Sequence, residues 1–198
     1  YDHKLTDKTE ISVESGAGIK YLTLYTKDGK VEQVRVDMGE PILEPDKIPV
    51  IADGSCVVDE PIEAGGKQWR MTCVSMGNPN CVVMMEEISR KKALHLGPYV
   101  ENSKYFPDRI NMQLCHVVDR ENIQIEIYER GAGYTYASGT GACAAASAAH
   151  KLGLVGNCVQ VHMQGGDLLV EFAEDDRVFM TGPVVYIGSI TLAENFFA

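Results

Sequence analysis

Short runs in which apolar residues alternate with polar ones, or in which β-branched and aromatic residues collect, recur along most of the chain. Such runs are typical of β-strands. They predict strands over residues 10–14, 19–26, 31–38, 69–76, 81–85, 111–118, 122–128, 159–163, 167–172, 178–180 and 184–191. Asp28-Gly29 predicts a tight hairpin turn between the second and third strands, because both residues accept the positive φ angles of such a turn.

Two stretches have helical character instead. Residues 88–96 form one, and Gly97-Pro98 is expected to end it, because proline cannot continue a helix. The other is the alanine-rich run over 140–152, since alanine is the strongest helix former, and Gly153 is well placed to end it. Because helices do not alternate with strands, we predict an α+β fold with antiparallel strands around one buried helix and without βαβ units.

Charge and composition exclude several classes of protein. The chain has 198 residues, and its 18 basic and 28 acidic side chains give a net charge of −10, which argues against binding nucleic acid or an anionic membrane surface. No apolar run approaches the roughly 18–20 residues that a membrane span needs. The six cysteines form no C-x-x-C pair and the five histidines lack metal-ligand spacing, so we expect no metal site. Reduced, buried thiols in a cytoplasmic protein are favoured over disulfides.

The stretch Ser138-Gly139-Thr140-Gly141 stands directly before the alanine run. Free N–H groups in the first turn of a helix, together with the positive end of its dipole, attract anions. The glycines leave that backbone accessible, so we expect a carboxylate or phosphate to bind there. The alternative is an ordinary glycine turn in front of a packed helix.

Two other motifs carry polar groups suited to binding. The sequence G-N-P-N at residues 77–80 places two amide side chains at a turn between strands, although such residues are also common in ordinary turns. Glu129-Arg130 stands at the end of a predicted strand. The arginine is suited to grip a carboxylate and the glutamate an ammonium group, with an exposed ion pair as the alternative.

Four motifs, M-G-N-P-N, F-P-D-R-I-N, E-R-G-A-G and A-S-G-T-G-A-C-A, follow one another in this order. With them the chain resembles, over residues 9–192, the diaminopimelate epimerase family of amino-acid racemases and epimerases, which work without pyridoxal phosphate. The resemblance implies a fold of two similar lobes, each with an antiparallel sheet wrapped around a central helix, and an active site between them. It also implies no cofactor and a small amino-acid substrate, and it is compatible with a homodimer.

The resemblance also bears on domain organisation. Residues 39–53 hold three prolines and little periodicity, which is typical of a linker between lobes, with an edge loop as the alternative. We therefore expect one complete lobe plus part of a second. The predicted division is the remainder of the N-terminal lobe over residues 1–46, a linker over 47–66, the C-terminal lobe over 67–183, and over 184–198 a strand that returns to the N-terminal lobe.

The resemblance implies removal and return of the α-proton of an amino acid such as LL- or meso-diaminopimelate, in the lysine and peptidoglycan precursor pathway. The substrate-binding residues that it implies are Asn78, Asn111, Glu129, Arg130, Gly139 and Thr140. In this scheme Arg130 binds the distal carboxylate and Glu129 assists at the amino group. In the family, two cysteines on opposite faces of the substrate exchange the proton.

The sequence departs from the family pattern at Ser138, where the family has its second catalytic cysteine, and at Asn80, where it usually has a histidine. A serine hydroxyl is a very weak acid, and asparagine does not titrate. Cys143 lies five residues further on, about 7.5 Å along the helix axis, and is not expected to replace the missing thiol. The family's earlier C-G-N-G segment has no counterpart here, so we expect an incomplete and inactive unit, either a fragment or a short variant completed by a partner chain.

Three other functions stay open at this point. One is an isomerase of the phenazine-pathway type, which has the same architecture but uses a carboxylic acid, and the E-R-G-A-G and G-N-P motifs argue against it. A second is a racemase of another amino acid, although Arg130 favours a substrate with a second carboxylate. The third is a non-catalytic amino-acid-binding homologue, which Ser138 supports.

Overall fold

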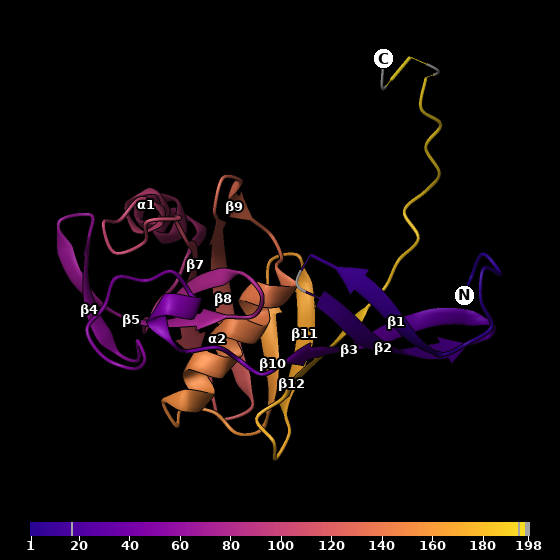
Figure 1. Ribbon diagram of the computed structural model, residues 1–198, viewed down its shortest axis with the longest axis horizontal. Helices are drawn as coiled ribbons and strands as arrows, with labels where there is room; N and C mark the ends of the chain where they lie inside the picture. The colour runs from indigo at the N-terminus through magenta and orange to yellow at the C-terminus, as the bar shows by residue number, and fades with distance from the viewer. Residues whose placement is uncertain (17, 194, 197–198) are drawn as a thin grey trace.

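The fold is a mixed sheet with two α-helices, seen in a computed structural model that describes residues 1–16, 18–193 and 195–196 (Figure 1). The strands are β1 (Glu10–Ser15), β2 (Gly18–Lys27), β3 (Lys30–Gly39), β4 (Glu60–Ala64), β5 (Lys67–Ser75), β6 (Pro79–Met84), β7 (Asn111–Val117), β8 (Asn122–Glu129), β9 (Gly133–Thr135), β10 (Cys158–Met163), β11 (Gly166–Phe172) and β12 (Val178–Pro183). The helices are α1 (Arg90–Glu101) and α2 (Gly139–Lys151), with a short 3-10 helix η1 (Pro45–Lys47).

The described strands form one 12-stranded sheet. Its order is β1-β2-β3-β12-β11-β10-β8-β7-β6-β5-β4, and β9 pairs with β8 off this path. The predicted hairpin between β2 and β3 is confirmed, with Asp28 and Gly29 at φ angles of 51° and 76°. β12 lies between β3 and β11. The last strand therefore joins the first three strands to the rest of the sheet.

Two strand pairs are parallel, which corrects the expectation of antiparallel strands without βαβ units. β6 pairs with β7, and β8 pairs with β10, in parallel. A parallel pair needs a connection of about a dozen residues or more. Helix α1 crosses from β6 to β7, and α2 lies in the crossover from β8 to β10. The sequence pattern missed this because hydrophobic periodicity marks where strands lie but not which strands pair.

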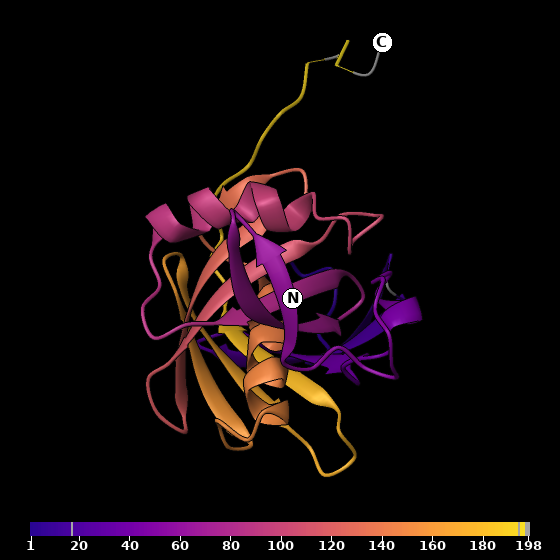
Figure 2. The same cartoon turned by 90° about the vertical axis from the view of Figure 1, so that its left-hand side faces the viewer.

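The two helices pack on opposite faces of the central strands (Figure 2). Residues that alternate along β5 and β7 belong to two separate hydrophobic clusters. Cys73 and Leu114 lie in the cluster that includes the buried side chains of α1. Val74 and Cys115 lie in the cluster that includes the alanines of α2. Since successive side chains of a strand point to opposite faces, strands β5 to β7 are covered on both sides.

Helix α2 is buried on nearly all sides. Residues 141–149 are all buried, and the helix contacts β5 to β8 and β10 to β12. The small alanine side chains allow these strands to approach the helix axis closely. The helix predicted over 140–152 is confirmed within one residue at each end. Gly153 follows with a φ angle of 72° and donates its amide to the carbonyl of His150 at 2.9 Å, as expected of a residue that ends a helix.

Helix α1 corrects the prediction that Gly97-Pro98 ends it, because it continues to Glu101. Pro98 has no N–H to offer the carbonyl of Leu94, but Leu94 is 47% exposed, so water can satisfy that carbonyl. Gly97 faces β8, and a Cβ atom there would overlap the ring of Tyr128. The glycine therefore serves close packing of helix and sheet, not helix termination.

Three strand predictions also need correction. β4 lies within the predicted linker over 47–66 and pairs with β5, and β9, which pairs with β8, was not predicted. Residues 184–191 form no strand and run away from the sheet (Figure 1). Their composition favours a strand, but a strand needs a partner. Both edges of β3 are already paired, with β2 and with β12, so the chain's return to the first strands is made by β12.

Neither helix in the part of the chain that the structure describes is long and apolar enough to cross a membrane. All six cysteines are free thiols, and four of them are buried.

Candidate active site

The predicted motifs meet at one end of the neighbouring central strands β6, β7 and β8. β6 and β7 are parallel and start there, and β8, which is antiparallel to β7, ends there. In this register Asn80 lies opposite Asn111. Helix α2 begins beside the same strand ends, since a Cβ atom on Gly141 would lie 2.9 Å from Nε2 of Gln113 on β7. Residues that are far apart in the sequence are thereby brought together.

Asn80 is the centre of a buried amide network. Its Nδ2 donates to the backbone carbonyl of Asn78 at 2.8 Å and to the Oδ1 of Asn78 at 3.0 Å. Its Oδ1 accepts hydrogen bonds from Nε2 of Gln113 at 3.1 Å and from Nδ2 of Asn111 at 3.4 Å. Asn80 itself is fully buried. The network therefore fixes the orientation of the partly exposed Asn78 side chain.

Asn111 extends the network to Arg130. Its Nδ2 donates to the carbonyl of Pro79 at 2.9 Å, and its Oδ1 accepts the backbone N–H of Arg130 at 2.9 Å. The exposed guanidinium of Arg130 donates from Nη1 to the carbonyl of Asp108 at 2.8 Å, and its remaining N–H groups bind no other described residue. Among the described residues no ion pair joins Arg130 to Glu129, so the alternative reading of this dipeptide as an ion pair is wrong.

The turn after Arg130 is held by the end of α1. The Oε1 atom of Glu101 accepts the backbone N–H of Gly131 at 2.8 Å and Nη1 of Arg109 at 3.1 Å. Glu101 is only 7% exposed, and its carboxylate is held by one charged donor, from Arg109, and one backbone donor, from Gly131. Sequence reasoning missed Glu101. The only signal near it was Arg109, which belongs to the F-P-D-R-I-N motif.

The start of α2 keeps two backbone amides free. Ser138 caps the helix, with its Oγ accepting the N–H of Gly141 at 3.2 Å and its carbonyl accepting the N–H of Ala142 at 2.9 Å. The amides of Gly139 and Thr140 donate to no group among the described residues. Both residues are partly exposed. The first turn of α2 therefore presents two donors and the positive end of its dipole to the surface.

Gln113 links this first turn to the amide network, and sequence reasoning missed it. It is fully buried, and its Oε1 accepts no hydrogen bond from any residue that the structure describes. Glycine is required at position 141 because any Cβ atom there would press on the Gln113 amide. The available signal was a single polar residue in the apolar run of β7. A buried polar side chain without a full set of partners is a feature of functional sites more than of ordinary cores.

No thiol takes over from Ser138. Cys143 is fully buried in α2, and burial raises the pKa of its thiol to about 12. A thiol with such a pKa stays protonated near neutral pH and is a poor base. The Ser138 hydroxyl accepts the Gly141 N–H as a helix cap, so among the described residues this turn is equipped for binding more than for proton transfer.

Comparison with known proteins gives this arrangement a family. The sequence profile described as diaminopimelate epimerase matches residues 72–187. A diaminopimelate epimerase of Agathobacter rectalis is 52% identical over 202 residues, which cover 97% of this chain and 71% of the relative. Another, of Moorella thermoacetica, is 46% identical over 94% of this chain and 67% of the relative. The chain belongs to the diaminopimelate epimerase family. Its relatives carry the name of an isomerase, as the sequence motifs predicted.

Solved structures show that the fold of this diaminopimelate epimerase family member is shared more widely. A probable proline racemase from Agrobacterium radiobacter, with bound carbonate, matches with a TM-score of 0.72 at 16% identity, over 99% of this chain and 65% of that one. A PhzF-family phenazine biosynthesis protein of Bacillus anthracis matches with a TM-score of 0.56 at 13% identity, over 90% of this chain and 66% of that one. At such low identity these likenesses establish the fold alone. The chain spans 65–71% of the length of these four proteins.

Proposed function

We propose that this protein epimerises a diaminopimelate-like amino acid by removing and returning the proton on its α-carbon. Family membership supports this proposal. The observation that carries it is the hydrogen-bonded group of Asn78, Asn80, Asn111 and Arg130, which Gln113 connects by packing to the first turn of α2. Amide and cationic donors from separate stretches of the chain there surround one helix N-terminus, which is an arrangement suited to a substrate with two carboxylates.

The amides of Gly139 and Thr140 would hold the carboxylate next to the reacting carbon. Removal of an α-proton is difficult because the negative charge that develops must be spread onto that carboxylate. N–H groups that already point at the charge stabilise it without further reorganisation. Both amides lack a partner among the described residues, so they are available for this task. The dipole of the 13-residue helix adds to their effect.

The other polar groups would select the substrate. The Arg130 guanidinium has the fork of donors that binds a distal carboxylate in bidentate fashion. Glu129, at the end of β8, would accept a hydrogen bond from the substrate ammonium group. Asn78 and Asn111 would supply amide contacts, and Asn80 would hold Asn78 in place. This division of roles favours diaminopimelate over amino acids with a single carboxylate.

The proposed site lacks a good acid–base group at position 138. Ser138 occupies the position at which the motif calls for a cysteine, and a hydroxyl is a far poorer acid and base than a thiol near neutral pH. We propose that the protein binds the substrate and, with Ser138 in place of a thiol, exchanges its α-proton slowly. A non-catalytic binding homologue would give the same binding, and the Ser138→Cys variant separates the two.

We also propose that two lobes share the single sheet. The first would be built on β1 to β3 and the second on the strands around α2, with residues 47–66 between them. The pairing of β12 with β3 supports a return of the chain to the first lobe, made by residues 178–183. The predicted return by residues 184–198 is not retained, because residues 184–191 form no strand.

The proposal is tested by calorimetric titration of the protein with meso-diaminopimelate and with lysine, which lacks the distal carboxylate. We expect diaminopimelate to bind about tenfold or more tightly than lysine, because a hydrogen bond to a charged group contributes about 1.5–3 kcal/mol. Arg130→Ala should remove this preference. Arg120→Ala is the matched control, since Arg120 is also exposed but contacts the carbonyl of Gly153 beyond the other end of α2. Equal effects of the two variants, or equal binding of the two ligands, would reject the proposed substrate class.

Turnover is followed separately, by NMR detection of solvent deuterium at the α-carbon of the same ligand. We expect little exchange with the present sequence and more with the Ser138→Cys variant. Binding without exchange in both proteins would instead support a binding homologue.

A further inference from the structure

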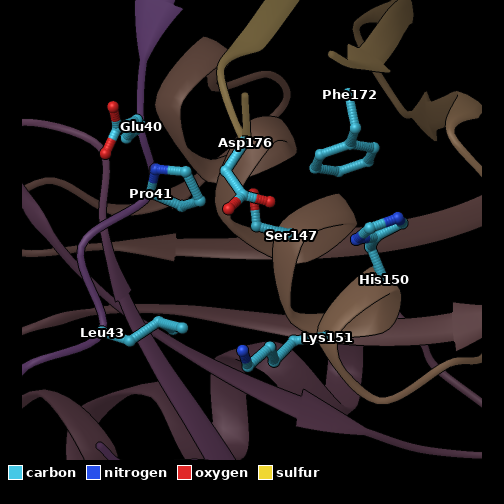
Figure 3. A pocket seen from close by; sticks show the side chains of 8 residues that line it. All are labelled: Glu40, Pro41, Leu43, Ser147, His150, Lys151, Phe172 and Asp176. Carbon is cyan, nitrogen blue, oxygen red and sulfur yellow. The ribbon is translucent and has the colours of Figure 1, made fainter. Parts of the chain in front are cut away.

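A cavity lies beside the last turns of α2, away from the proposed active site at the start of this helix. Figure 3 shows the side chains that line it. The cavity has a volume of about 170 Å³. Three segments line it: residues 40–43 after β3, the last turns of α2, and residues 172–176 between β11 and β12. Ser147 in this cavity is nine residues from Ser138, which is about 13 Å along the helix. The cavity is therefore separate from the free amides of α2.

Ser147 places an unpartnered hydroxyl at the wall of this cavity. The residue is 5% exposed, and its buried Oγ atom has no hydrogen-bond partner in the part of the chain that the structure describes. A helical serine commonly bonds back to the carbonyl one turn earlier, and this one does not. A buried hydroxyl without a partner costs about 1–3 kcal/mol. The side chain points into the cavity, so a bound molecule would satisfy it (Figure 3).

The charges around the hydroxyl favour a cation. The carboxylate of Asp176 is turned towards Ser147 (Figure 3), and Glu40 also lines the cavity, with its carboxylate turned away from Ser147 in this view. Neither carboxylate forms an ion pair among the described residues, and the neighbouring Arg177 is bound to Asp37. The C-terminal end of α2 adds the negative end of its dipole. Lys151 is the one fully charged cation in the lining, so carboxylates outnumber it.

The remaining walls are apolar or already committed. The ring of His150 stacks on Phe172 with centroids 4.3 Å apart, and its Nε2 is 3.0 Å from the Oδ1 of Asn157. Pro41 and Leu43 supply an apolar wall on the other side. A volume of about 170 Å³ is smaller than the roughly 300–1,000 Å³ of pockets for drug-sized ligands. A ligand here therefore has few heavy atoms and a short apolar part.

We propose that this cavity binds a small primary amine. The ammonium group donates to the Asp176 carboxylate and to the Ser147 hydroxyl, and the alkyl part lies against Pro41 and Leu43. This site is independent of the proposed active site, because the ligand needs no carboxylate and contacts none of the residues around the start of α2.

The test is an NMR titration of the ¹⁵N-labelled protein with propylamine hydrochloride at pH 7. 1-Propanol and sodium propionate are the neutral and anionic controls. We expect saturable shifts of the amides of residues 147–151 and 173–177 with the amine only. Equal shifts with propanol, shifts that do not saturate, or shifts elsewhere in the chain would overturn the proposal.

Variants make the assignment specific. Asp176→Asn should weaken amine binding about tenfold or more, because it removes a charged acceptor. Asp176 has a φ angle of 64°, which asparagine adopts readily, so this variant keeps its turn. Ser147→Ala should weaken binding about fivefold. Glu174→Gln removes the same charge from the same turn outside the cavity and should change binding less than twofold. Equal losses in Asp176→Asn and Glu174→Gln would mean a diffuse electrostatic effect and would overturn the site.

Discussion

Helices α1 and α2 begin in the same way and differ in almost everything after that. Each starts after a serine whose Oγ accepts the backbone N–H three residues on, with Ser89 bonded to Lys92 and Ser138 to Gly141, both at 3.2 Å. Each crosses between parallel neighbours in the sheet. Yet α1 buries only one face, whereas residues 141–149 of α2 are all buried.

The first turns of the two helices explain why only one is a candidate binding site. α1 opens with Arg90-Lys91-Lys92, whose cations oppose the helix dipole and cover its N-terminus with long side chains. α2 opens with Gly139-Thr140-Gly141, which leaves the amides bare, beside the Asn80 network. A capping serine therefore stabilises a helix start but does not make it a site. What distinguishes α2 is a first turn without charged side chains, next to the Asn80 amide network.

The largest expected effect concerns the packing of α1 against β8. Gly97→Ala should lower the free energy of unfolding by about 3 kcal/mol, because the new Cβ atom overlaps the Tyr128 ring. Urea unfolding measures this. Gly156→Ala is the control, since its Cβ atom would meet the carbonyl of Arg120 at an ordinary 3.7 Å and should cost less than about 0.5 kcal/mol. Equal losses would mean that α1 is not packed against β8 as described.

A smaller effect is expected under α2. Gly141→Ala should cost about 2 kcal/mol, because its Cβ atom presses on the amide of Gln113 rather than on a rigid ring. In a Gln113→Ala background the same change should cost about 1 kcal/mol less, since the contact with the Gln113 amide is gone and only the 3.1 Å contacts with Ser138 remain. Unfolding free energies of the four proteins give the coupling. Additive losses would show that Gln113 does not contact the first turn of α2.

The two caps should be equal in stability and unequal in function. Ser89→Ala and Ser138→Ala should each cost about 1 kcal/mol, the usual loss for a helix cap. Only Ser138→Ala should change diaminopimelate affinity in calorimetry, because only that cap lies at the proposed site. A matching change in affinity with Ser89→Ala would remove the distinction between the helices.

The smallest effect is a pH dependence near the start of α1, where the guanidinium of Arg90 lies 5.2 Å from the centroid of the Tyr134 ring. Burial, and then the 2.5 Å hydrogen bond to Glu126, raise the pKa of Tyr134 to about 12. An unfolded tyrosine titrates near pH 10, so between about pH 10 and 12 the unfolded chain loses a proton that the folded protein keeps. This contribution to stability is complete below pH 10 and falls as pH rises.

In Tyr134→Phe, the free energy of unfolding should therefore fall by about 0.5–1 kcal/mol less between pH 8 and pH 11 than in the unchanged protein. This value is reduced for the partial exposure of Tyr134. Tyr99→Phe, at a side chain that is 53% exposed, is the control for urea unfolding at the two pH values. An unchanged slope in Tyr134→Phe would contradict the raised pKa.

The sequence predicted most elements but not how they pair. The bounds of α2 followed from alanine propensity, and the hairpin at Asp28-Gly29 followed from turn chemistry, because both are local properties. The parallel pairs β6–β7 and β8–β10, and the extension of α1 past Gly97, depend on contacts with distant residues. Local patterns carry no information on such contacts.

The candidate site shows the same division. Motifs brought Asn78, Asn111 and Arg130 to attention, and their hydrogen bonds join them through Asn80. Gln113 and Glu101 escaped notice, because a polar residue in a strand or a helix end has no local mark of its distant partner. Their roles became visible only from their contacts with Asn80 and with Gly131.

The central claim is that the bare amides of α2, and not those of α1, hold the substrate's carboxylate. The most direct measurement is the ¹⁵N–¹H NMR spectrum of the protein titrated with meso-diaminopimelate. We expect saturable shifts of the Gly139 and Thr140 amides, with the equivalent amides of α1, those of Arg90 and Lys91, unchanged. Saturable binding that leaves Gly139 and Thr140 unshifted would contradict it.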